Sequence, residues 1–182
     1  MNLAHQNNDL YRNFTAYQKA VIIYDLTYHF CDRFISYGDR TKDQMIQAAR
    51  SGKQNIVEGK AASLTSSETH IKLLNVARAS FQELLVDFED YLRTRKLQIW
   101  ETSSAKVKAM RELGIKHNDP EIFIKLAEER DDEVIANMII VLIHQEDVLL
   151  RKHIEKQLSK FVNEGGFRES LSKARRDNRK QK

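Results

Sequence analysis

Apolar residues recur at alternating intervals of three and four positions along four stretches of this sequence, and this repeat constrains the fold more than any other feature. The stretches are residues 13–36, 42–62, 68–96 and 132–163. Such spacing places apolar side chains along one stripe of an α-helix, where they can pack against neighbouring helices. A single proline and six glycines in 182 residues leave little material for turns. We therefore predict an all-α protein built as an up-and-down four-helix bundle.

Two shorter helices are predicted between the third and fourth long ones, where the regular repeat is lost. The first covers residues 105–113, and the second starts at Pro120 with Asp119 as its N-cap. Earlier in the chain, Gly38 fits a left-handed C-cap and Thr41 fits the N-cap of the following helix. The expected fold is a four-helix bundle with additional short helices between its third and fourth members.

The net charge of +4 is concentrated at the C-terminal end of the chain. Residues 165–182 contain seven basic and two acidic residues, a balance of +5, so the first 164 residues carry −1. This composition is typical of a disordered tail that follows a single domain at residues 1–164. Such a tail can attract phosphate backbones or an acidic partner, or serve only to keep the protein soluble.

A cytoplasmic location is expected from cysteine usage and hydropathy. The single cysteine, Cys31, excludes a disulfide framework and fits a reducing compartment, where it would serve as a small buried hydrophobe. Residues 1–13 are polar and show no signal-peptide pattern. The longest apolar run, at residues 138–143, is far shorter than the roughly 20 residues that a membrane span needs. No membrane association is therefore expected.

Two glycines lie on the apolar stripe of the predicted helix at 42–62. Each interior glycine costs up to about 1 kcal/mol of helix propensity relative to alanine, which is tolerated where two backbones approach closely. We interpret Gly52 as such a packing position, while Gly59 fits either packing or the beginning of the helix end.

A set of polar side chains lies beside these glycines at i, i+4 and i+7. Its members are Ser51, Asn55 and Glu58, and the residues expected to face them from the helix at 68–96 are Asn75, Arg78, Ser80 and Glu83. A partly buried amide or carboxylate needs a partner, so an interhelical network such as Glu58 with Arg78 is predicted. We interpret the set as structural, with recognition of a partner as the alternative.

Basic residues of the helix at 42–62 form a possible phosphate-binding stripe along one outer face. They are Lys42, Arg50, Lys53 and Lys60, joined by Lys72 of the next helix and by Arg175, Arg176, Arg179 and Lys180 of the tail. No aromatic residues interleave with the stripe, so any nucleic-acid binding would depend on the backbone and its shape rather than on base stacking. A merely solvated face is the alternative.

An apolar surplus on the last long helix favours a homo-oligomer. Residues 138–143 are apolar on every side of the helix, whereas an outer helix of a bundle should show only one apolar stripe. Ile22 and Ile23 also lie off the stripe of their helix. Either the short helices at 105–130 cover this surplus or a second copy of the protein does, and we favour the second copy.

Motifs for catalysis, cofactors and metals are mostly absent from the sequence. No histidine has an acidic residue three positions before it, as a di-iron bundle requires, and there is no glycine-rich phosphate loop or nucleophile elbow. Arg111 and His117 match the arginine–histidine spacing of helical HEPN-class ribonucleases. Gly114 and the following Asn-Asp-Pro indicate that the chain leaves the helix before His117, which weakens this alternative.

The segments "AARSGKQNIVEG" and "SSETHIKLLNVARASFQELLVDFEDYL" resemble the four-helix-bundle proteins related to ribosomal-RNA intervening-sequence proteins, and most closely the four-helix-bundle suffix domain branch. The match is specific over residues 44–100, extends over 14–164 and does not reach the tail. The residues of the shared pattern are Ala49, Ser51 or Gly52, Asn55, Ile56, Glu58, Gly59, Ala77, Ser80, Glu83 and Leu84.

The resemblance implies an up-and-down bundle, frequent homo-oligomers with pentamers among relatives, and no enzymatic activity. One relative, the accessory protein of diversity-generating retroelements, binds nucleic acid and a reverse transcriptase. This chain departs from the pattern by an insertion at 101–130 and by a body that is not basic. We predict a non-enzymatic oligomeric accessory protein that binds nucleic acid, without cofactor, metal or small-molecule substrate. The alternatives are a protein-binding scaffold with an acidic partner and, more distantly, the ribonuclease.

Overall fold

The computed structural model describes residues 11–164 and Arg176, and every regular element in that part of the chain is an α-helix. The long helices are α2 (Thr15–Phe34), α3 (Arg40–Ala62), α4 (Ser67–Thr94) and α7 (Asp132–Glu164), and the short ones are α5 (Ala105–Lys116) and α6 (Pro120–Glu128). The all-α prediction is confirmed. Among these described helices, none combines the length and the apolar character that crossing a bilayer requires.

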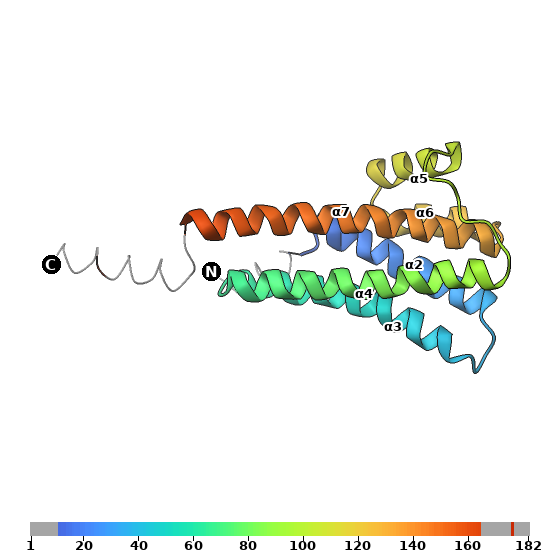
Figure 1. The fold of residues 1–182 in the computed structure, drawn as a ribbon, viewed down its shortest axis with the longest axis horizontal. Coiled ribbons are helices and arrows are strands. Elements are labelled where there is room, and N and C mark those ends of the chain that lie inside the picture. Colours follow the sequence, from blue (N-terminus) through green and yellow to red (C-terminus); the bar gives the residue numbers. More distant parts are fainter. Residues whose placement is uncertain (1–10, 165–175, 177–182) are drawn as a thin grey trace.

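The long helices lie side by side, and each contacts two of the others (Figure 1). α3 packs against α2 and α4, and α7 packs against the same two helices from the other side. The short helices are peripheral, since α5 packs on α7 and α6 on α2. The insertion after α4 therefore lies on the outside of the four long helices, next to α2 and α7.

Polar caps define where the helices begin. Asp39 is the N-cap of α3, because its carboxylate accepts a hydrogen bond of 2.9 Å from the backbone N–H of Thr41. The prediction of Thr41 as this cap was therefore wrong by two residues, while Gly38 does take a left-handed φ of 87° in the preceding loop. Ser66 caps α4, and Asp119 caps α6 as predicted from the sequence.

The apolar run of α7 is covered within the chain itself. Residues 138–143 expose at most 5% of their surface, and Ile22 and Ile23 are fully buried. The reason is the position of the insertion, which places α5 on α7 and α6 on α2. The sequence argument for a second copy over this face was therefore wrong, and the short helices provide the cover instead.

The segment between α4 and α5 is fixed to α7 by one buried amide. Asn137 donates a hydrogen bond from Nδ2 to the backbone carbonyl of Gln98 (2.8 Å) and accepts one at Oδ1 from the backbone N–H of Trp100 (2.8 Å). Asn137 exposes only 1% of its surface, so these bonds also satisfy a polar side chain that is removed from water. Trp100 lines a pocket together with Met110 of α5 and Met138 of α7.

Gly52 marks the closest approach of α3 to α4. A Cβ atom placed on Gly52 would lie 2.6 Å from the ring of Phe81, which is itself buried. The same atom on Gly59 would lie 3.4 Å from Leu73 and Leu74, an ordinary contact distance. Only Gly52 is therefore required for close packing, as predicted, whereas Gly59 lies inside α3 with room for a methyl group.

These two glycines give a matched pair of substitutions. Gly52→Ala should destabilise the protein by about 1–3 kcal/mol, because overpacking against Phe81 outweighs the gain of up to about 1 kcal/mol in helix propensity. Gly59→Ala should be neutral or stabilising, because it gains the propensity without a clash. Urea unfolding of the three proteins measures both effects. Equal stability of the two variants would contradict the assigned contact.

Candidate functional site

Three residues of the predicted polar set meet between α3 and α4. The hydroxyls of Ser51 and Ser80 lie 3.0 Å apart across the two helices. Asn55 donates from Nδ2 to the backbone carbonyl of Ser51 (2.9 Å) and to its hydroxyl (3.3 Å). These side chains bond to one another and to the backbone of α3, which supports the structural interpretation of the set.

Arg78 takes a different partner from the predicted one. Its Nε donates to the Asp147 carboxylate at 2.9 Å, which links α4 to α7. Glu58 and Glu83 are exposed, and Glu83 lines an acidic groove with Asp87. The predicted Glu58–Arg78 pair was therefore wrong, because Arg78 lies on the side of α4 that faces α7 while Glu58 lies on the outside of α3.

Two lysines of the predicted basic stripe lie over aromatic rings of the N-terminal part of the fold. The Lys53 ammonium is 3.7 Å from the centre of the Tyr24 ring, and the Lys60 ammonium is 4.5 Å from that of Phe14. Burial lowers the pKa of both lysines. Aromatic residues thus do lie next to the basic stripe, contrary to expectation. They come from outside α3, and they form cation–π contacts with two of its lysines.

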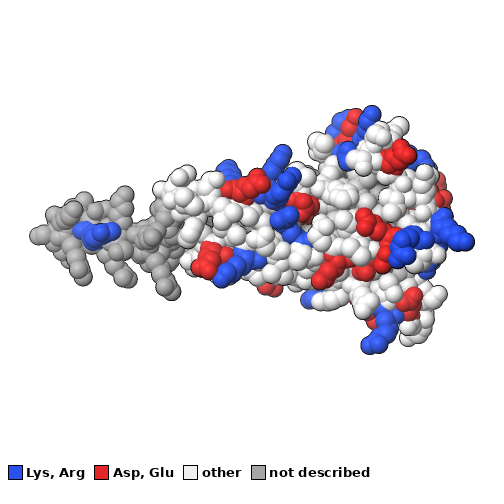
Figure 2. Space-filling view, in the orientation of Figure 1, with Lys and Arg blue, Asp and Glu red and all other residues white. Residues whose placement is uncertain are grey.

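Two of the remaining residues of the stripe form ion pairs, and one is exposed. Lys42 pairs with Asp32 at 3.2 Å, and Lys72 pairs with Glu68 at 2.7 Å. Arg50 is exposed. The face shown in Figure 2 likewise carries Lys and Arg side chains among Asp and Glu, with no large area of one sign. The stripe is therefore mostly engaged within the protein and does not form a continuous cationic surface.

Only one of the four tail residues proposed for binding can be placed. Arg176 is helical and exposed. The others, Arg175, Arg179 and Lys180, lie outside the described residues. The contribution of the tail therefore stays a prediction from its charge.

Arg111 and His117 do not line a common pocket. α5 ends at Lys116, and His117 follows in an extended conformation with φ of −129°, as the sequence indicated. His117 is exposed, whereas Arg111 lies beside a cavity between α2, α5 and α7 that His117 does not line. This separation gives no support to the ribonuclease alternative.

A buried lysine and a buried glutamate lie where α2, α5 and α7 meet. Lys19 exposes 2% of its surface, and its ammonium donates to the backbone carbonyl of Gly114 in the last turn of α5. Glu146 is fully buried, and neither of its oxygens has a hydrogen-bond partner among the described residues. Burial raises the pKa of Glu146 and lowers that of Lys19, and the opposite charge of each partner opposes the shift.

Sequence reasoning missed this pair, although each member interrupts an apolar stripe. Lys19 lies on the buried face that Ala16 and Ile23 define, and Glu146 occupies the helical position between Ile143 and Leu150. A charged residue at such a position indicates either a break in the core or an interior polar contact. Here Lys19 binds the C-terminal end of α5, where a cation is favourable.

Two histidines connect α3, α4 and α7. His70 is buried, and its Nδ1 lies 2.6 Å from the carbonyl of Gly59, so Nδ1–H is the donor. Its Nε2 then accepts from Nε2–H of His153 at 3.1 Å. Burial lowers the pKa of His153 to about 4, with the charges of Lys60, His70 and Lys156 acting in the same direction. The pair is therefore a neutral, interior hydrogen-bonded bridge at neutral pH.

The residues that the structure describes form neither a metal site nor a reactive thiol site. No group of three or more His, Cys, Asp or Glu side chains there is placed to hold a metal ion. Cys31 is buried, as predicted, and burial raises the pKa of its thiol to about 12, so the reactive thiolate is disfavoured.

No protein-family model, curated protein or solved structure matches this chain. The resemblance of residues 44–100 to the intervening-sequence bundle family therefore stays a prediction.

Replacement of Lys19 tests the interior pair. Lys19→Met should destabilise the protein by about 2–3 kcal/mol, because it leaves Glu146 without a compensating charge and removes the bond to Gly114. Glu146→Leu should also destabilise, by leaving a buried ammonium. The double variant should lose at least about 1 kcal/mol less than the sum of the single losses, as measured by urea unfolding. Additive losses would contradict the pairing.

Acid stability tests the histidine bridge. His153 has a folded pKa of about 4 against 6.5 for a free side chain, so folding disfavours its protonation. Its contribution to stability is complete above about pH 6.5 and is lost as the pH falls toward about 4. His153→Gln retains an N–H donor for His70 without titrating. Its free energy of unfolding should therefore fall less than that of the wild type between pH 7.5 and pH 5, and an equal fall would contradict this assignment.

Proposed function

We propose that this protein is a non-enzymatic interaction protein, an up-and-down four-helix bundle of α2, α3, α4 and α7 that self-associates through the C-terminal end of α7. One observation carries the proposal. Leu158, Phe161 and Val162 expose 45%, 39% and 79% of their surfaces on the last turns of α7. Contiguous exposed apolar residues at helical spacing favour a protein-protein contact.

These residues continue the apolar stripe of α7 beyond its buried part. Leu150 and Ile154 are buried, and Leu158 follows at the same spacing of four. The ring of Phe14, just before α2, lies against His153, so α2 begins beside this level of α7 (Figure 1). The end of α7 thus presents a bundle-type stripe that a second copy could cover.

Nucleic-acid binding through the tail is the second candidate. The +5 balance of residues 165–182 supports it, and the segment directly follows the exposed end of α7. The body gives less support, because Lys42, Lys53 and Lys60 are engaged with residues outside α3. Binding would depend on phosphate charge rather than base sequence, and an acidic protein is the alternative partner of the same tail.

Light scattering coupled to gel filtration tests the self-association. The wild type should elute as an oligomer, and the Leu158→Glu/Phe161→Glu double variant should elute with the mass of one chain, because it places charge in the contact. Val76→Glu/Val86→Glu is a matched control, since these valines of α4 expose 47% and 53% of their surfaces. The control should keep the wild-type mass.

A single-chain mass for the wild type, or an oligomer that survives in the Leu158→Glu/Phe161→Glu variant, would overturn the self-association.

Adding a nucleic-acid duplex to the same gel-filtration runs tests whether the tail binds nucleic acid. The wild type should bind it at about 50 mM salt and release it as salt rises, whereas a chain that ends at Glu164 should not bind. Binding that ignores salt, or that persists without the tail, would contradict the second candidate.

A further inference from the structure

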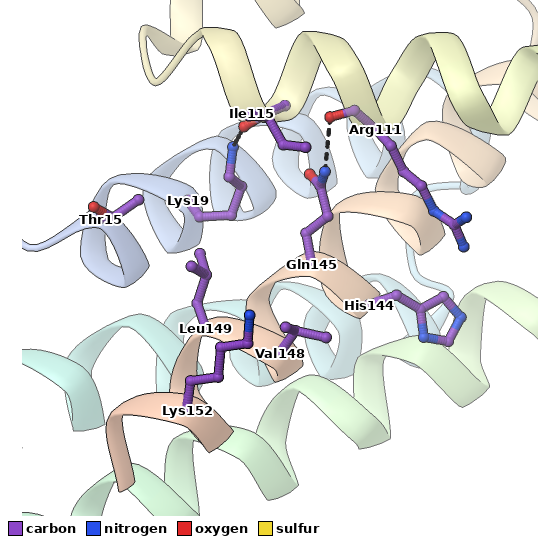
Figure 3. A pocket seen from close by; sticks show the side chains of 10 residues that line it. Thr15, Lys19, Arg111, Ile115, His144, Gln145, Val148, Leu149 and Lys152 are labelled. Carbon is purple, nitrogen blue, oxygen red and sulfur yellow. Dashed lines mark hydrogen bonds between the residues drawn. The ribbon is translucent and has the colours of Figure 1, made fainter. Parts of the chain in front are cut away.

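A cavity of about 510 Å³ lies between α2, α5 and α7 (Figure 3), and Leu158, Phe161 and Val162 are not among its lining residues. Ile115 of α5 and Val148 and Leu149 of α7 form its apolar walls. Its volume lies within the range of about 300–1,000 Å³ that is typical of small-molecule sites. Ile115 and Val148 expose 76% and 37% of their surfaces, so this apolar lining is in contact with solvent.

The charged groups that line the cavity, within the described part of the chain, are cationic. Arg111, Lys152 and Lys19 contribute to it together with His144, and none of the described lining residues is acidic. Arg111 and Lys152 form no ion pair within the described part of the chain, whereas Lys116 on the same helix as Arg111 pairs with Glu112. Two unpaired cations beside an apolar wall are complementary to a molecule that is both apolar and negatively charged.

The position of Arg111 makes it the anchor for such an anion. Figure 3 shows the side chains of Arg111 and His144 at one end of the cavity, with Val148 between them and Lys152. A guanidinium can bind a carboxylate, sulfonate or phosphate group through two parallel hydrogen bonds. Lys19 is less suited to this role, because its ammonium is turned to the Gly114 carbonyl.

Two side-chain bonds fix the wall that carries Arg111. Gln145 donates from Nε2 to the backbone carbonyl of Arg111 at 2.8 Å, and Lys19 holds the carbonyl of Gly114 one turn further on. A Cβ atom on Gly114 would collide with Gln145, so α5 and α7 approach closely at this point. The cavity is therefore formed before any ligand arrives, which lowers the entropic cost of binding.

We propose that this cavity binds a small amphipathic anion, with its charged group on Arg111 and its apolar body against Ile115, Val148 and Leu149. The site does not depend on self-association through α7.

The probe is the fluorescent monoanion 8-anilinonaphthalene-1-sulfonate, with decanoate as competitor. Decanoate should displace the dye, and decyltrimethylammonium, which has the same chain and the opposite charge, should displace it at least about tenfold more weakly.

Val148→Trp should abolish dye binding by filling the cavity. Arg111→Gln should weaken it by about tenfold or more, the effect of losing one charge-assisted hydrogen bond. Arg50→Gln, which removes an exposed cation elsewhere, should have no effect.

Circular dichroism and urea unfolding would show whether each variant is folded. If Val148→Trp does not fold, Arg111→Gln still tests the proposal. Unchanged affinity in Arg111→Gln, or equal displacement by the two decyl compounds, would overturn the proposal. Dye binding that is lost in the Leu158→Glu/Phe161→Glu variant but kept in Arg111→Gln would place the dye on the end of α7 and overturn it as well. In the Leu158→Glu/Phe161→Glu variant, loss of self-association with unchanged dye affinity would support both proposals.

Discussion

Burial of the apolar segment of α7 at residues 138–143 determines how the rest of the chain is arranged. A helix that is apolar on every side needs neighbours all round, and α2 and α4 can cover only two of its flanks. The remaining flank is covered by α5, and Asn137 holds the segment before α5 in place through the backbone of Gln98 and Trp100. The insertion therefore completes the burial of α7, although it lies on the outside of the four long helices.

Buried and partly buried polar groups specify which helices meet and at what level. Lys19 connects α2 with α5, Arg78 connects α4 with α7, and the histidine bridge joins α7 to both α3 and α4. Apolar stripes alone tolerate sliding of one helix past another, whereas a buried donor must meet its acceptor at one position. These contacts thus account for polar residues at positions where larger apolar side chains would bury more surface.

Much of the fold could be predicted from the sequence, because helix periodicity and capping are local. The bounds of the long helices agree within two residues, and Gly52 was recognised from its cost to the helix. The packing partner of each helix face could not be predicted in the same way. Arg78 faces α7 rather than α3, and α5 covers α7, because periodicity shows which face is buried but not which helix lies opposite. The cavity beside Arg111 was missed for the same reason, since its lining comes from three separate segments.

The attachment of α5 has a consequence for the behaviour of the protein in concentrated solution. α5 has 12 residues and is held by its buried Val107 and Met110 and by the side-chain bonds from Lys19 and Gln145, so its release would be a local opening that leaves the four long helices in place. Its release would uncover "MIIVLI", an uncharged segment with strong β-propensity and no proline. Segments of this kind pair with copies of themselves when exposed. Docking of α5 therefore also protects the chain against aggregation. Amide hydrogen exchange within α7 would measure the population of the state in which α5 is released.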